Sequence, residues 1–247
     1  MYKNLKIKRM MKTKKLILIT LLFCVFLIDC NKENDDTLSG SIVDGKITAK
    51  VENASEFSNV VAVKFMAYDI SVNRHVELAR GIWKNGGFTI KLPKALDPNF
   101  LHPLIRRNVL LGGYWIPGIT EIQPTLTISN ENVRVDNNYF VGIDKDGEEV
   151  AFFYLFMEDK NSFHEANFTY VDSDVTISGY TKREFQVSPN WSERNTTTYS
   201  VSWKEGWNVW YFSEYQLATD SMSITEYQWS TTPIRGLKWY GDKPAIL

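Results

Sequence analysis

Cysteine is nearly absent from this chain of 247 residues: there are only Cys24 and Cys30, and none follows Cys30. The long remainder of the chain therefore has no disulfide, no thiolate metal site and no cysteine nucleophile. Its stability must come from an ordinary hydrophobic core. Aromatic residues are plentiful enough to build one, with 14 Phe, 12 Tyr and 8 Trp.

Marks of catalysis and of metal binding are equally scarce. The three histidines, His75, His102 and His164, share no zinc-ligand spacing, and no Gly-x-Ser-x-Gly motif occurs. A glycosidase needs only two carboxylates from distant strands, so hydrolysis stays open as the weakest alternative. No acidic residue is distinguished from ordinary surface acids, Glu158, Asp159, Glu165 and Glu226 included. The sequence therefore predicts no catalytic residue, no metal ligand and no cofactor.

The chain also lacks an apolar run of the ~20 residues that a membrane-spanning helix needs. Its longest such stretch, residues 16–28, has 13 residues and follows a basic head that ends at Lys15. This order predicts a secretory signal over residues 1–29. The basic stretch ahead of Met11 is unusually long for such a signal, and translation from Met10 or Met11 in place of Met1 would leave a conventional one.

The signal ends in Leu27-Ile28-Asp29-Cys30, which resembles a bacterial lipoprotein signal. The resemblance implies that Cys30 becomes the lipid-bearing first residue and holds the protein to a membrane. The charged stretch that follows, within a tether at 30–37, resembles the surface-export signal of Bacteroidetes lipoproteins. We therefore expect a surface-exposed outer-membrane lipoprotein. The alternative is an ordinary secretory peptide with an incidental cysteine.

Positive charge is in short supply after the signal. Seven of the 28 basic residues and one of the 29 acidic residues precede Cys30, which leaves 21 against 28 and a net charge of −7. This balance argues against nucleic acid and against an anionic membrane face as partners.

No helical period is sustained beyond the signal, and short alternating apolar runs separated by turn residues indicate strands. In the first part, strands are expected at 46–51, 60–68, 75–83 and 88–92, with a tight turn at Asn85-Gly86-Gly87. The run 87–93 resembles transthyretin-like or carboxypeptidase-regulatory-like β-sandwiches, which implies a spacer or accessory fold for residues 38–96. The proline-rich segment 97–124 is expected to be a connector.

From residue 125 the β pattern returns, with strands expected at 139–143, 149–156, 167–171, 175–178, 183–187, 197–203, 207–212, 223–229 and 237–240. Asp144-Lys145-Asp146-Gly147 mimics the opening of a calcium loop. The position where a bidentate Glu is needed is Leu155, so a hairpin turn is the better interpretation. The phrases 170–179, 204–208 and 237–240 resemble Bacteroidetes lipoproteins of no established activity. We predict an all-β protein of two antiparallel β-sandwich units, 38–96 and a larger 125–247, packed together.

One strand is apolar on both faces, since Val209 and Tyr211 point one way and Trp210 and Phe212 the other. One face must therefore meet something besides its own sandwich core: the first unit, a protein partner or a sugar. The candidate ligand platform is Trp207, Trp210, Phe212, Tyr227 and Trp229.

The expected function is a lipid-anchored, non-catalytic binding or structural module of the cell envelope. Surface glycan binding through the C-terminal aromatic residues is the first alternative.

Overall fold

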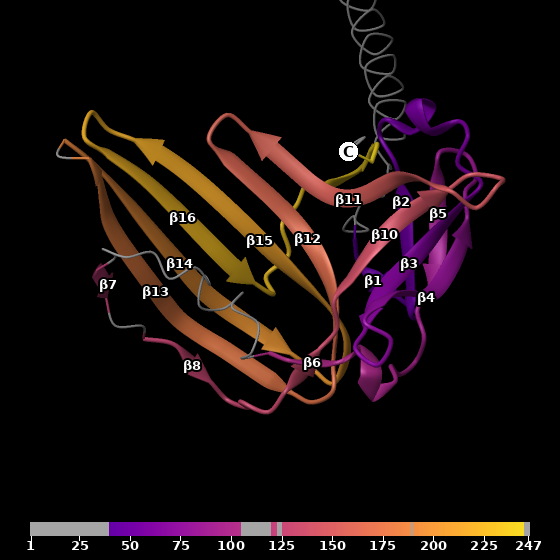
Figure 1. The fold of residues 1–247 in the computed structure, drawn as a ribbon, viewed down its shortest axis with the longest axis horizontal. Coiled ribbons are helices and arrows are strands. Elements are labelled where there is room, and N and C mark those ends of the chain that lie inside the picture. Colours follow the sequence, from indigo (N-terminus) through magenta and orange to yellow (C-terminus); the bar gives the residue numbers. More distant parts are fainter. Residues whose placement is uncertain (1–39, 105–119, 123–124, 189, 245–247) are drawn as a thin grey trace, which may run out of the picture. The chain divides into compact units, whose positions relative to one another are not determined.

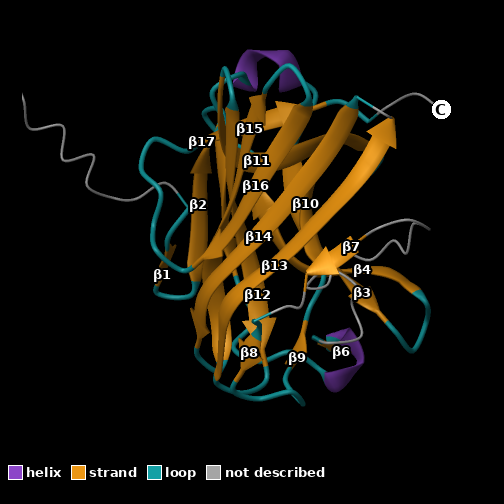
Figure 2. Cartoon of the chain, turned by 90° about the vertical axis from the view of Figure 1, so that its left-hand side faces the viewer, coloured by secondary structure: helices purple, strands orange, loops and turns teal. Residues whose placement is uncertain are grey.

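The computed structural model describes residues 40–104, 120–122, 125–188 and 190–244. Their regular structure consists of strands and two short 3-10 turns, η1 (Ala54–Phe57) and η2 (Pro98–Phe100), which lie at opposite ends of the unit (Figure 2). The all-β class predicted from the alternating pattern is therefore confirmed. Residues 38–247 form one compact unit.

Among the described residues the strands form a sheet of three and a sheet of fourteen. The small sheet has the order β1 (Ile42–Val43), β2 (Lys46–Lys50), β5 (Gly87–Lys91). The main path of the large sheet runs β4 (Arg74–Ile82), β3 (Ala62–Asp69), β10 (Asn138–Ile143), β11 (Glu149–Asp159), β12 (Ser162–Val171), β15 (Gly206–Ala218), β16 (Met222–Ser230), β14 (Trp191–Trp203), β13 (Val175–Ser188), β7 (Thr120–Ile122). Figure 1 shows the long strands β12 to β16 side by side.

Four further strands attach to this path. They are β17 (Lys238–Asp242) on β11, β8 (Thr127–Ile128) on β13, β9 (Arg134–Val135) on β12 and β6 (His102–Pro103) on β9. Of the expected connector, residues 105–119 and 123–124 lie outside the described residues, and the remainder contributes η2, β6 and β7.

The two expected units, 38–96 and 125–247, are packed together by strand pairing as well as by side chains. β10 pairs with β3 on one side and with β11 on the other. The first segment thus divides its strands, giving β1, β2 and β5 to the small sheet and β3 and β4 to the large one.

One pairing differs from the antiparallel expectation: β14 and β16 run parallel. β14 and β15 are joined by a short turn and run in opposite directions. β16 lies between them in the sheet, and because it is antiparallel to β15 it is parallel to β14. Alternation along a strand reveals which residues share a face but not which strand lies next to it.

The main core lies between the two sheets, where the inward residues of β2 and β5 meet those of β3, β10, β11, β12 and β17. Phe57, Phe65 and Phe153 are almost fully buried there. Burial of each such side chain stabilises the fold by about 1.5–3 kcal/mol. A second core lies on the opposite face of the large sheet; its members include Val133, Val171, Val175, Ile177, Val201 and Trp203.

The predicted turn between β4 and β5 is present. Asn85 and Gly86 both have positive φ, 54° and 76°, as a two-residue hairpin turn of the primed type requires. Lys84 and Gly87 exchange backbone hydrogen bonds of 2.9 and 3.1 Å across it. This turn carries the chain from the large sheet to the small one.

Candidate ligand-binding site

β15 is apolar on both faces, and the structure uses the two faces differently. Val209 and Tyr211 belong to the main core between the sheets. Trp210 packs against the second core, on the opposite face. The alternation predicted from the sequence is therefore correct, and the face that meets the first segment is the one with Val209 and Tyr211.

Four aromatic side chains gather on the second face of β15 and β16. Trp210 and Trp229 stack with ring centroids 4.5 Å apart and planes 6° apart. Phe212 and Tyr227 stack at 5.8 Å and 25°. All four residues are half-buried. We call Trp210, Phe212, Tyr227 and Trp229 the aromatic platform.

The strand register explains why these rings meet. Phe212 lies directly opposite Trp229 in the β15–β16 hairpin. On its other side Trp229 is paired with the buried Tyr199 of β14, whose ring centroid is 6.0 Å away. Trp210 contacts the buried Trp203 at 6.5 Å. On the β14 side the platform is thus in contact with buried rings of the second core.

Trp207, the fifth residue of the predicted platform, lies on the other face of β15. Its ring contacts Phe65 at 5.5 Å and Tyr170 at 5.4 Å. Its Nε1 donates a hydrogen bond of 2.8 Å to the carbonyl oxygen of Pro93. Trp207 therefore joins β15 to the first segment, and the structure does not bring it together with the other four.

Polar groups of β12 border the platform. Glu165 is paired with Phe212, and Asn167 with Trp210. The Asn167 side-chain amide donates a hydrogen bond of 2.9 Å to a carboxylate oxygen of Glu165. Burial raises the pKa of Glu165, while this hydrogen bond opposes the rise. The sequence alone does not place this pair beside the rings, because its position depends on the register between strands far apart in the chain.

A second group of rings lies on the far side of Glu165. Phe156 of β11 is directly opposite Glu165. It stacks on Phe163 at 5.7 Å and contacts Tyr240 at 4.9 Å. The same face of the sheet therefore presents two aromatic groups separated by a carboxylate and an amide. Flat apolar rings beside hydrogen-bonding groups suit a ligand that has both apolar faces and hydroxyls.

The remaining sequence candidates have structural roles in turns and strands. The Asp144 carboxylate accepts hydrogen bonds from the backbone N–H groups of Asp146 and Glu148, as in an ordinary hairpin turn. His164 is bonded to Ser213 and Ser162 within the sheet. Over the described ranges, no three His, Cys, Asp or Glu side chains gather as metal ligands would.

The signal, the tether and Cys30 lie outside the described residues, so lipidation stays a prediction. No helix in the described part of the chain is long and apolar enough to cross a membrane. Comparison with family models, with curated proteins and with solved structures finds no match for this chain.

Proposed function

We propose that this protein is a lipid-anchored, non-catalytic module of the bacterial cell envelope that binds glycan chains. The stacked pair Trp210–Trp229 carries the proposal. Sugar rings have flat C–H faces that stack on indole, and both residues of the pair are only half-buried. The anchor rests on the signal-like sequence that ends at Cys30.

An extended ligand fits better than a single sugar. The aromatic platform and the group formed by Phe156, Phe163 and Tyr240 lie on one face, with Glu165 and Asn167 between them. Successive rings of a polysaccharide can stack on the two groups while their hydroxyls meet the carboxylate and the amide. Repeated weak contacts along one chain would then give useful affinity.

Binding is tested with a glycan array and titration of the best ligand. Trp229→Ala should weaken that ligand about tenfold, the loss expected for one aromatic stacking contact. Tyr215→Ala is the matched control, because Tyr215 is an exposed ring on the opposite face of β15. If no glycan on the array binds, or if both variants lose the same affinity, glycan binding is contradicted and a structural module is favoured.

The anchor is tested by Cys30→Ala in the native host. The substitution should abolish acylation, which a mass difference in the purified protein detects. It should also leave the signal uncut. An unchanged mass and processing pattern would contradict lipidation at Cys30.

A further inference from the structure

The outer face of the small sheet is lined with lysines. In β2 the residues alternate between exposed and buried, and so do those of β5 from Phe88 to Lys91. The buried members join the main core between the sheets. The exposed members are Lys46, Thr48, Lys50, Thr89 and Lys91. The outward face of these two strands thus carries three cations and no carboxylate.

Two of these lysines oppose each other. Lys46 lies directly across from Lys91 in the β2–β5 ladder, and like charges in such a pair destabilise a sheet. Neither of them, nor Lys50, takes part in any of the ion pairs found among the described residues. The next pair along the ladder is Thr48 and Thr89, whose hydroxyls are 3.2 Å apart. This face therefore carries three lysines that belong to none of these ion pairs, on a protein whose charge is negative overall.

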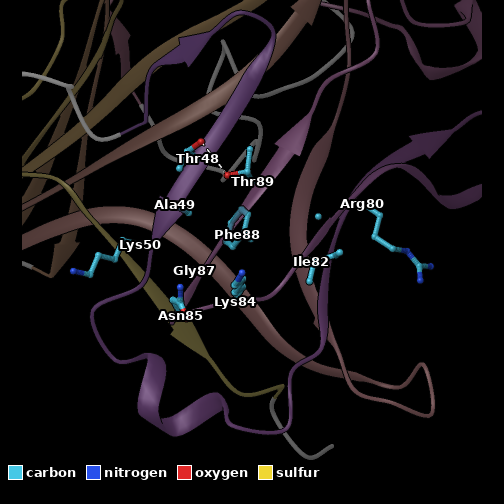
Figure 3. A pocket seen from close by; sticks show the side chains of 11 residues that line it. Thr48, Ala49, Lys50, Arg80, Ile82, Lys84, Asn85, Gly87, Phe88 and Thr89 are labelled. Carbon is cyan, nitrogen blue, oxygen red and sulfur yellow. Dashed lines mark hydrogen bonds between the residues drawn. The ribbon is translucent and has the colours of Figure 1, made fainter.

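A groove opens beside this face, between β4 and the strands β2 and β5. Figure 3 shows Lys50 and Arg80 pointing to opposite sides of it, with Lys84 near the turn. Arg80 is already paired with Glu77 at 2.7 Å. The free cations are therefore spread over a surface and do not converge on one point. Such an array suits many anionic groups in a plane better than a single bound anion.

The face also stands close to the expected anchor along the chain. Ile42, the first residue of β1, is the twelfth residue after Cys30. Twelve residues span at most about 40 Å when fully extended. On β1 itself Val43 is 54% exposed and is paired with Lys46, so an apolar side chain lies at the edge of the lysines.

We propose that the outer face of the small sheet docks on the anionic lipid headgroups of the membrane that holds the anchor. This inference rests on the lipid anchor of the proposed function. The net charge of −7 alone argues against such a partner, but it is an average over the molecule. With the lysines turned to the membrane, the acidic remainder faces away, beyond the ~8–10 Å over which salt screens charges. Docking would also leave the aromatic face of the large sheet oriented in a fixed way.

The test uses the lipidated protein in vesicles of phosphatidylcholine, with and without phosphatidylglycerol. Acetylation of each lysine amine is followed by mass spectrometry. Lys46, Lys50 and Lys91 should react several times more slowly in the phosphatidylglycerol vesicles, and high salt should remove the protection. Lys145 and Lys160, exposed in turns of the large sheet, should react equally in both. Equal rates for all five lysines would overturn the proposal.

Two variants with the same change in charge sharpen the test. Lys46→Glu/Lys91→Glu should abolish the protection of Lys50, since each lysine removed weakens association with an anionic surface about fivefold. Lys145→Glu/Lys160→Glu should leave it intact. A soluble polyuronate is added in a separate sample. If it slows acetylation of the same lysines and phosphatidylglycerol does not, the partner is an acidic glycan and the membrane proposal is wrong. Failure of the anchor shows separately, as loss of flotation with neutral vesicles. Flotation with phosphatidylglycerol vesicles then still tests the lysines.

Discussion

At the scale of single residues, Asp136 shows how burial and hydrogen bonding compete. Its carboxylate is 4% exposed between β9 and β10. It accepts hydrogen bonds from the Tyr170 backbone N–H, the Thr169 hydroxyl and the Asn138 amide. These donors favour the ionised form, but burial outweighs them and raises the pKa of Asp136 from 3.8 to about 6.

Because the folded state holds this proton more tightly than the unfolded state, the contribution of Asp136 to stability is greatest below pH 4. It is lost as pH rises to about 6, by about 3 kcal/mol at most. In Asp136→Asn that loss is absent. The free energy of unfolding of the variant, relative to that of the wild type, should therefore rise by this amount between pH 4 and pH 7. Urea unfolding at a series of pH values measures the difference. Parallel profiles for the two proteins would show that Asp136 does not titrate in this range.

The pair Lys46 and Lys91 makes a second prediction for a single residue. Lys46→Glu replaces a like-charge pair with an opposite pair and should raise the free energy of unfolding by about 0.5 kcal/mol. Lys50→Glu is the control, because Lys50 faces Gly87, which has no side chain. Urea unfolding in low salt compares the variants. A gain from Lys50→Glu equal to that from Lys46→Glu would point to net charge and not to pairing.

At the scale of elements, β13 shows where the sequence pattern misleads. Two strands were expected, 175–178 and 183–187, with residues 179–182 between them; one strand of 14 residues is present. Gly179 has a φ of 114°, and a Cβ there would lie 2.0 Å from the carbonyl oxygen of Thr125. The glycine marks the place where the chain entering β8 runs close beside β13, with the Thr125 N–H bonded to the Tyr180 carbonyl oxygen. Turn residues in a sequence therefore predicted a break where the structure has a close approach.

Gly179→Ala should destabilise the protein by at least about 1–3 kcal/mol, the cost of a non-glycine residue in a sparsely populated conformation. Gly147→Ala is the matched control, because Gly147 also has a positive φ, 88°, but has open space around its Cβ position. We expect Gly179→Ala to lose more free energy of unfolding than Gly147→Ala, and the difference measures the clash with the Thr125 backbone. Similar midpoints in urea for the two variants would contradict that contact.

Some features of the candidate site can be predicted from the sequence and others cannot. Alternation along β15 predicts that Trp210 and Phe212 share a face, and the same parity separates Trp207 from them. It does not reveal which face meets the core, because both are apolar. Glu165 and Asn167 could not be placed beside the rings, since the β12–β15 register depends on pairing across some 40 residues. The lysines of β2 and β5, by contrast, occupy outward positions of alternating strands and could have been found from the sequence.

At the scale of the whole molecule, the beginning and the end of the described chain are joined. The Asn53 side chain exchanges two hydrogen bonds of 2.9 Å with the backbone of Gly241. Trp239 of β17 is buried among the rings of Phe88, Phe140 and Phe168. Strands from both segments also share the large sheet. We therefore expect cooperative unfolding of residues 38–247.

Calorimetry of Asn53→Ala tests this expectation. Removing the side chain leaves the Gly241 backbone groups unsatisfied and should cost about 1–3 kcal/mol. The single transition should move to lower temperature without splitting. Asn59→Ala, an exposed position, should leave the transition in place. A second peak in either protein, or a peak whose enthalpy is too small for the whole of residues 38–247, would show that the two segments unfold independently.

The position of β16 has a consequence for how the chain folds. β14 and β15 follow each other along the chain but are separated in the sheet by β16, which comes after both in the sequence. A growing chain can close β14 and β15 into a simple hairpin, and that non-native pair must open again before β16 can enter. The Thr219–Met222 turn, closed by a backbone hydrogen bond of 2.8 Å, favours early pairing of β15 with β16. The productive route is thus the one in which this local hairpin forms first, because the parallel ladder with β14 joins residues 30 positions apart and closes slowly.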